Sequence, residues 1–224
     1  MTSQRNALVL LSGGQDSTTC LYWAIDRFGS ASVASVSFDY GQRHRIELEC
    51  AATIAAHVDV PHRCLPIDTF AALGGNALTD AALVPETGVA ATDDLPNTFV
   101  PGRNLVFLTL AAAYAYQRGI TELVTGVAQT DYSGYPDCRE DTMTALQQSL
   151  RLGMEHPVTI HAPLMHRSKK ETVQLAETLD AIDAMAMTHT CYNGERPPCQ
   201  QCAACELRAR GFAEAGIADP LLPT

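Results

Sequence analysis

Short apolar or β-branched runs alternate along the chain with longer segments in which apolar side chains recur at helical spacing. Runs of about four to eight such residues between turn residues are typical of buried strands. The predicted strands cover residues 7–11, 33–38, 63–67 and 122–127, and the predicted helices cover 16–28, 44–58, 104–118, 141–154, 168–180 and 203–215. This alternation predicts an α/β fold with a parallel, Rossmann-like sheet covered by helices on both faces.

A chain of 224 residues suits one α/β domain with a small appendage. We expect the main domain over residues 1–185 and a small C-terminal segment with a terminal helix over residues 186–224, together forming one compact unit. Residues 70–101 interrupt the alternation with glycines and prolines, and so long a loop is usually functional or mobile. We therefore expect this loop near the active site.

The charge balance limits the partners that the chain can bind. Its 15 Lys and Arg residues against 25 Asp and Glu residues give a net charge of −10, which disfavours a large nucleic-acid partner. The first apolar run, 7–11, is too short for a signal peptide, and no segment approaches the length of a membrane span. We expect a cytoplasmic protein with no membrane partner.

The segment Ser12-Gly-Gly-Gln-Asp-Ser17 joins the first predicted strand to the first predicted helix, where parallel sheets bind anions. Its two glycines allow close approach to a phosphate, and free N–H groups and the helix dipole favour negative charge there. Asp16 suits such a site if Mg²⁺ intervenes or if its carboxylate caps the helix. The alternative is a plain tight turn with a helix cap.

Four cysteines lie within 15 residues of one another, namely Cys191, Cys199, Cys202 and Cys205. Four thiolates can surround one tetrahedral Zn²⁺, and a closed coordination sphere makes such a site structural. An iron–sulfur cluster is the main alternative, and disulfides or free thiols are another. Four further cysteines are predicted to be small buried hydrophobic residues: Cys20, Cys50, Cys64 and Cys138.

Three polar motifs lie at strand ends or helix starts, where α/β sheets bind ligands: residues 39–44, 99–104 and 129–139. Their side chains suit a flat, polar heterocycle with a carboxylate, because tyrosines stack, aspartates accept hydrogen bonds and arginines pair with carboxylates. These residues are Tyr40, Tyr132 and Tyr135, Asp131 and Asp137, and Arg43, Arg103 and Arg139. The alternative is that the motifs are ordinary turns and that Asn104 merely caps its helix.

The segment 12–17, called the phosphate loop below, resembles the pyrophosphatase loop of the N-type ATP pyrophosphatases. In those enzymes the loop holds the β,γ-pyrophosphate. The resemblance narrows to the 7-cyano-7-deazaguanine synthase family. It is carried by Tyr40-Gly-Gln-Arg-His44, Val100-Pro-Gly-Arg-Asn104, Asp131-Tyr-Ser-Gly-Tyr-Pro-Asp-Cys-Arg139, Cys191-Tyr-Asn-Gly194 and the cysteine cluster with Arg208-Ala-Arg210. Arg196-Pro-Pro198 stands where we expect a Gly-rich stretch in relatives, and this departure affects the backbone of the cysteine loop but not the cysteines themselves.

The resemblance implies a ligase that uses ATP and Mg²⁺, carries one structural zinc and is often a homodimer. Its implied substrates are 7-carboxy-7-deazaguanine and ammonia. The sequence shows no glutaminase signature, so we expect free ammonia or ammonia from an unidentified partner as the donor. The implied product is the nitrile of queuosine biosynthesis, formed through an adenylated carboxylate and an amide. The residues implied to bind ATP are Leu10, Leu11, Ser12, Gly13, Gly14, Gln15, Asp16, Ser17 and Thr18. Those implied to bind the substrate are Tyr40, Gln42, Arg43, Asn104, Tyr132, Ser133, Gly134, Tyr135, Asp137 and Arg139. Asp16, Arg103 and Asp131 are implied in catalysis, and the four cysteines are implied as zinc ligands.

Two other hypotheses compete with an ATP-dependent ligase. A tRNA-modifying enzyme of the thiolase type shares the phosphate loop, but the acidic balance and the lack of a basic RNA-binding module argue against it. A nucleotide-binding zinc module without catalysis is the other. Lys169 or Lys170 can stabilise departing pyrophosphate, or can belong to a solvated helical turn.

Overall fold

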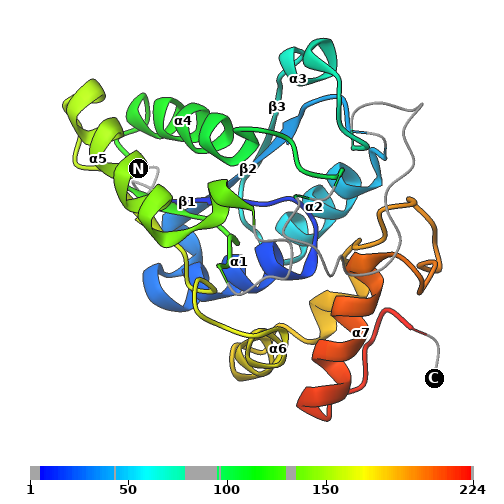
Figure 1. Cartoon of the computed structure of the whole chain (residues 1–224). Helices are drawn as coiled ribbons and strands as arrows, with labels where there is room; N and C mark the ends of the chain where they lie inside the picture. Colours follow the sequence, from blue (N-terminus) through cyan, green and yellow to red (C-terminus); the bar gives the residue numbers. More distant parts are fainter. Residues whose placement is uncertain (1–5, 43, 79–94, 96, 130–134, 223–224) are drawn as a thin grey trace.

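The computed structural model describes residues 6–42, 44–78, 95, 97–129 and 135–222 (Figure 1). Its centre is a sheet of five parallel strands in the order β3-β2-β1-β4-β5. The strands are β1 (Ala7–Leu10), β2 (Val33–Asp39), β3 (His62–Pro66), β4 (Glu122–Val124) and β5 (Thr159–His161). The α/β fold with a parallel sheet, predicted from the pattern, is confirmed.

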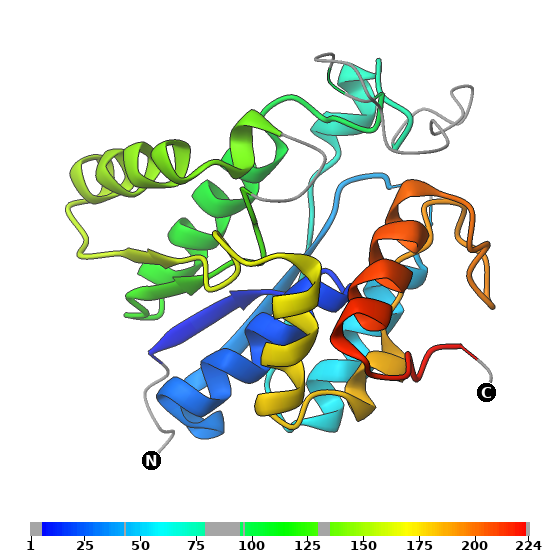
Figure 2. The same cartoon turned by 60° about the horizontal axis from the view of Figure 1, so that its bottom comes forward.

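Alternate side chains of β1 enter two different cores. Leu8 packs in a cluster with residues of α4 (Arg103–Tyr116) and α5 (Glu140–Met154) on one face of the sheet. Ala7 and Val9 pack in a second cluster with residues of α1 (Gln15–Phe28) and α2 (Ile46–His57) on the other face. Figures 1 and 2 show these two helical layers. Because both faces are covered, β1 is apolar without alternation, as the sequence shows.

Helices α6 (Lys169–Thr178) and α7 (Ala203–Ala215) pack against each other beside α1 (Figure 2). A capping box starts α6, since the Ser168 hydroxyl accepts from the Glu171 N–H and the Glu171 carboxylate accepts from the Ser168 N–H. Gly211 permits the close packing: a Cβ there would lie 2.9 Å from the Cβ of Lys169. The two helices share an apolar cluster that includes Val173 and Phe212.

The structure also contains elements that the pattern did not predict. They are β5, the helix α3 (Thr69–Leu73), which overlaps the start of the loop 70–101, and three short 3₁₀ helices, η1 (Ser30–Ser32), η2 (Pro136–Cys138) and η3 (Asp183–Met187). Strand β4 ends at Val124 rather than at residue 127, and Gly126 beyond its end packs against the start of α1. In the part of the chain that the structure describes, no helix has the length and apolar character needed to cross a membrane.

Candidate functional site

The order of the strands places a cavity at the carboxyl end of the sheet. The chain runs from β1 outward to β2 and β3, and then returns to the other side of β1 with β4. Ligands of open α/β sheets bind at such a reversal, where the loops after neighbouring strands diverge. A cavity of about 350 Å³ lies there, lined by the loop after β1, by Thr125 and Gly126 after β4, and by residues of α2, α4 and the C-terminal segment.

The phosphate loop is held in shape by its own hydroxyl groups. The Ser17 hydroxyl accepts from the Ser12 N–H at 3.1 Å and donates to the Gly14 carbonyl at 3.1 Å, and the Thr18 hydroxyl donates to the same carbonyl at 2.8 Å. Gly13 has a φ of +82°, and a Cβ there would overlap the Glu47 carbonyl oxygen. Seven of the predicted ATP residues line the cavity: Leu10, Leu11, Ser12, Gly14, Gln15, Asp16 and Ser17. Gly13 and Thr18 shape the backbone behind them.

Asp16 lies in the first turn of α1 and reaches across to α6. Its Oδ2 accepts from the Lys169 ammonium at 2.7 Å, whereas its Oδ1 is buried and has no hydrogen-bond partner among the described residues. The alternative that Asp16 caps α1 is wrong, because Gly14 is the N-cap and no side chain caps the helix. A buried carboxylate oxygen without a partner fits the coordination of a hard cation such as Mg²⁺. The Gln15 side-chain amide nitrogen is likewise buried without a described partner.

Aromatic side chains surround Arg103 on the opposite wall of the cavity. The Arg103 guanidinium lies 5.9 Å from the centre of the Tyr40 ring, and Tyr135 and Tyr192 also line the cavity. Burial alone would lower the pKa of Arg103, but Tyr40, Tyr135, Tyr192 and Asp137 raise it above its ordinary value. The guanidinium therefore stays charged and can pair with an anionic substrate group.

Asn104 and Asp137 are held together at the start of α4. Asp137 Oδ2 accepts from the Asn104 backbone N–H at 3.0 Å, and the Asn104 side-chain amide donates to Cys138 Sγ at 3.3 Å. The alternative that Asn104 caps its helix is wrong, since Gly102 is the N-cap. The side chain of Gln42 lines the cavity but accepts from the Tyr40 N–H at 2.9 Å and donates to the Phe38 carbonyl at 3.2 Å, so its amide fixes the end of β2.

The remaining predicted substrate residues are not all at the cavity. Tyr135 lines it and its hydroxyl lies 2.7 Å from that of Thr98. Arg139 is exposed at the N-cap of α5 and does not line the cavity. The predictions for Arg43, Asp131, Tyr132, Ser133 and Gly134 lie outside the described residues.

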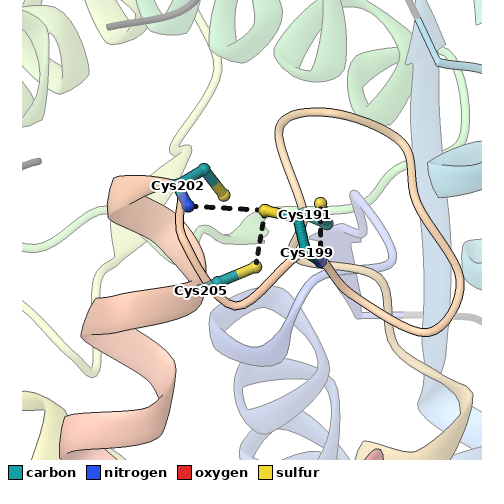
Figure 3. Close-up of side chains that lie close together, drawn as sticks. All are labelled: Cys191, Cys199, Cys202 and Cys205. Carbon is teal, nitrogen blue, oxygen red and sulfur yellow. Dashed lines mark hydrogen bonds between the residues drawn. The ribbon is translucent and has the colours of Figure 1, made fainter. Parts of the chain in front are cut away.

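The four predicted cysteine ligands converge at the start of α7 (Figure 3). Their sulfur atoms all lie within 4.8 Å of one another, and Cys199 Sγ is 3.9 Å from Cys205 Sγ. A tetrahedral Zn²⁺ with bonds of about 2.3 Å needs sulfur atoms about 3.8 Å apart, so the cluster fits such an ion. The prediction of a four-cysteine metal site agrees with this geometry.

Backbone amides support the same sulfur atoms. Cys199 Sγ accepts from the N–H groups of Gln201 at 3.5 Å and Cys202 at 3.4 Å, and Cys191 Sγ accepts from the Cys199 N–H at 3.5 Å. A hydrogen bond from the Cys205 thiol lowers the pKa of Cys202, and the same bond raises the pKa of Cys205. The hydrogen bonds from backbone N–H groups stabilise the thiolate form, which metal binding requires.

Of the four cysteines outside the cluster, Cys20 and Cys50 are buried, as predicted, and Cys138 is partly buried. The prediction for Cys64 was wrong, because its side chain is exposed on β3.

Several cavity residues were missed by reasoning from sequence. Glu47 and Gly126 line the cavity, and so does His189, whose backbone N–H donates to the Gly13 carbonyl at 2.9 Å. The His189 ring is 2.9 Å from the Cys191 carbonyl, so this residue joins the phosphate loop to the cysteine cluster. Gly126 was missed because it fell inside the predicted strand 122–127, although a glycine within a strand pattern is itself a signal of close backbone approach. Glu47 and His189 gave no signal, because their neighbours come from distant parts of the chain.

Comparisons with known proteins find relatives that extend over nearly the whole chain. Residues 6–216 match the family described as queuosine biosynthesis protein QueC. A 7-cyano-7-deazaguanine synthase of Chromobacterium violaceum is 68% identical over 220 residues, covering 98% of this chain and 94% of the relative. The enzyme of that name from Laribacter hongkongensis is 66% identical over 217 residues, covering 97% and 94%.

The fold also occurs in a solved structure of the U34-tRNA thiolase NcsA from Methanococcus maripaludis with its 4Fe–4S cluster. The TM-score is 0.51 at 15% identity, and the match covers 94% of this chain and 65% of that one. At this identity the likeness concerns the fold alone. The family match and the two curated relatives extend over nearly the whole chain, and the chain therefore belongs to the queuosine biosynthesis QueC family.

Proposed function

We propose that the chain converts 7-carboxy-7-deazaguanine and ammonia into 7-cyano-7-deazaguanine with ATP, in queuosine biosynthesis. One observation carries the proposal: a single cavity is lined both by the phosphate loop, residues 12–17, and by Tyr40, Arg103, Asn104 and Tyr135. A nucleotide on the loop and a flat, carboxylated heterocycle on the other wall would then meet in one space. The size of the cavity is in the range of small-molecule sites.

The oxygen balance explains the need for ATP. A carboxylate carries two oxygens on its carbon and a nitrile carries none, and each oxygen leaves readily only after activation. The substrate carboxylate attacks the α-phosphate, pyrophosphate leaves, and ammonia displaces AMP to give the amide. The amide oxygen is adenylated in turn, and AMP leaves as the nitrile forms. The chain contributes positioning and charge neutralisation rather than a nucleophile.

Named residues take roles in this scheme. The N–H groups of the phosphate loop would hold the pyrophosphate, and Arg103 would pair with the substrate carboxylate. Mg²⁺ would neutralise phosphate charge beside the free oxygen of Asp16, and Lys169 already lies 2.7 Å from the other oxygen. Zinc on the four cysteines would stabilise the C-terminal segment, residues 186–224, against the main domain, residues 1–185.

The homodimer, which the family resemblance implies, and the cytoplasmic location both stay predictions. The tRNA-thiolase alternative is not favoured, because the relatives that share about two thirds of the residues are named synthases.

The test is incubation with 7-carboxy-7-deazaguanine, ammonium and Mg·ATP, followed by mass spectrometry. We expect the nitrile together with AMP and pyrophosphate, and an isolated amide that the enzyme converts to nitrile when ATP is added. An amide that never converts would contradict the two-stage scheme. Absence of both nitrile and amide would overturn the proposed function, and salt-sensitive tRNA binding would favour the thiolase.

A further inference from the structure

The proposed reaction, on which this inference rests, requires a proton acceptor. The nitrogen enters as ammonia with three hydrogens and ends in a nitrile with none. One proton leaves when the C–N bond of the amide forms, and two more leave when the amide becomes the nitrile. An acceptor beside the reacting carbon would speed each of these transfers.

The described residues that line the cavity include two carboxylates, Asp16 and Glu47. Asp16 is already engaged, since one of its oxygens accepts from the Lys169 ammonium and the other is the one proposed to lie beside Mg²⁺. The His189 ring, another possible base, is engaged by the Cys191 carbonyl. For the Glu47 carboxylate, by contrast, the structure gives no hydrogen bond or ion pair with any described residue. Of the two carboxylates, Glu47 is therefore the one that is free to take a proton.

Packing fixes Glu47 at the place where the chemistry is proposed. It lies in the first turn of α2, and its backbone carbonyl is in contact with Gly13 of the phosphate loop. The charge of Arg103, on α4 across the cavity, acts on its carboxyl group, and Glu47 in turn acts on the hydroxyls of Tyr40 and Tyr192. The side chain thus lies between the phosphate loop and the proposed substrate wall.

We infer that Glu47 is the general base that removes protons from the nitrogen. In the first stage, ammonia attacks the acyl carbon, the C–N bond forms, and the C–O bond breaks with its electron pair leaving on AMP. The proton from nitrogen passes to Glu47, which releases it to solvent. In the second stage, the adenylated amide loses its remaining two N–H protons to Glu47 in succession as the C–O bond to AMP breaks and the triple bond forms.

The acid–base properties of the cavity agree with this role. Burial raises the pKa of Glu47 from 4.5 to about 7, against a smaller opposing effect of Arg103, and a base that titrates near the working pH is effective. The other titratable groups that face Glu47 are Tyr40, Tyr192 and, on its own helix, Cys50. Burial raises the pKa of each of these, so they remain protonated where Glu47 ionises.

The test compares Glu47→Gln and Glu47→Asp with Glu49→Gln, which alters an exposed carboxylate on the same helix. Two activities are measured on the full chain: substrate-dependent exchange of labelled pyrophosphate into ATP without ammonia, and nitrile formation with saturating ammonium. In E47Q we expect exchange near the wild-type rate and nitrile formation about 10²–10⁴-fold slower. Glu47→Asp should restore part of the rate, and E49Q should match the wild type.

The pH profile provides the second readout. With free ammonia kept saturating at every pH, nitrile formation by the wild type should fall as the pH drops through the ionisation of Glu47, and E47Q should lack this acid limb. If E47Q forms the nitrile at the wild-type rate and its pH profile keeps the acid limb, the inference is wrong. A parallel loss of pyrophosphate exchange would also overturn it, since Glu47 would then act in binding or adenylation. A wild-type enzyme that forms no nitrile would instead overturn the proposed function, and this inference with it.

Discussion

At the scale of single residues, Glu47 shows that a buried carboxylate in the cavity lowers the stability of the folded protein above a certain pH. Its folded pKa of about 7 lies above the ordinary 4.5, so between these values the folded chain holds a proton that the unfolded chain has released. Stability therefore falls as the pH rises through this window. Such costs are common where a side chain is kept for function rather than for packing.

Replacing Glu47 by glutamine should therefore stabilise the protein at alkaline pH. We expect the free energy of unfolding of E47Q to exceed that of the wild type by about 1–3 kcal/mol at pH 8, and the difference to vanish near pH 4, where the wild-type carboxyl is neutral in both states. Urea unfolding at the two pH values measures this, with E49Q as the exposed control. A difference between E47Q and wild type that does not change with pH would contradict the raised pKa.

At the scale of elements, the spacing of apolar residues predicted those helices whose ends are determined by the local sequence. Helix α7 was predicted at its observed bounds, and α1, α4 and α5 to within two residues at each end, because each has a clear start signal and helical spacing. Strand β5 was missed because Thr159–His161 is too short to show a period and is half-buried throughout. The phosphate loop and the four cysteines were found because their chemistry lies within one short segment.

The parts of the site that were missed depend on contacts between distant elements. His189 illustrates this, because its backbone N–H donates to Gly13 while its ring lies against the Cys191 carbonyl. No spacing in the sequence relates residue 189 to residue 13. Through His189, the loop that would hold phosphate is supported by the segment that would hold metal.

Removing the metal should therefore weaken nucleotide binding as well as stability. We expect Cys199→Ser, or treatment with a strong chelator, to lower the melting temperature by roughly 5–15 °C. The dissociation constant for ATP should rise about fivefold to tenfold, which corresponds to the loss of about one supporting hydrogen bond. Calorimetry and metal analysis of the same samples measure both effects. Cys64→Ser, at an exposed cysteine outside the cluster, should change neither, and metal loss without a change in ATP affinity would contradict the coupling.

At the scale of the whole molecule, the C-terminal residues are joined to the rest of the chain through Arg208 on α7. Its guanidinium donates to both oxygens of Asp219, at 2.6 and 2.7 Å, and this pair is 4% and 6% exposed. It also donates to the Thr188 hydroxyl at 2.7 Å and to the Met185 carbonyl at 3.1 Å. One buried side chain thus links the tail, α7 and the segment that leads into the cysteine cluster.

Breaking this pair from the tail side should destabilise the whole protein, because Asp219→Ala leaves a buried guanidinium without its counter-charge. We expect a loss of about 3–5 kcal/mol in the free energy of unfolding. Salt should change this loss little, since buried pairs are poorly screened. Denaturant unfolding at low and high salt measures both expectations.

Glu214→Ala removes an exposed carboxylate from α7 and should stay within about 0.5 kcal/mol of the wild type. If D219A is as stable as E214A, the tail does not depend on this ion pair, and the stability of the C-terminal segment must come from the cysteine cluster and from the packing of α7 on α6.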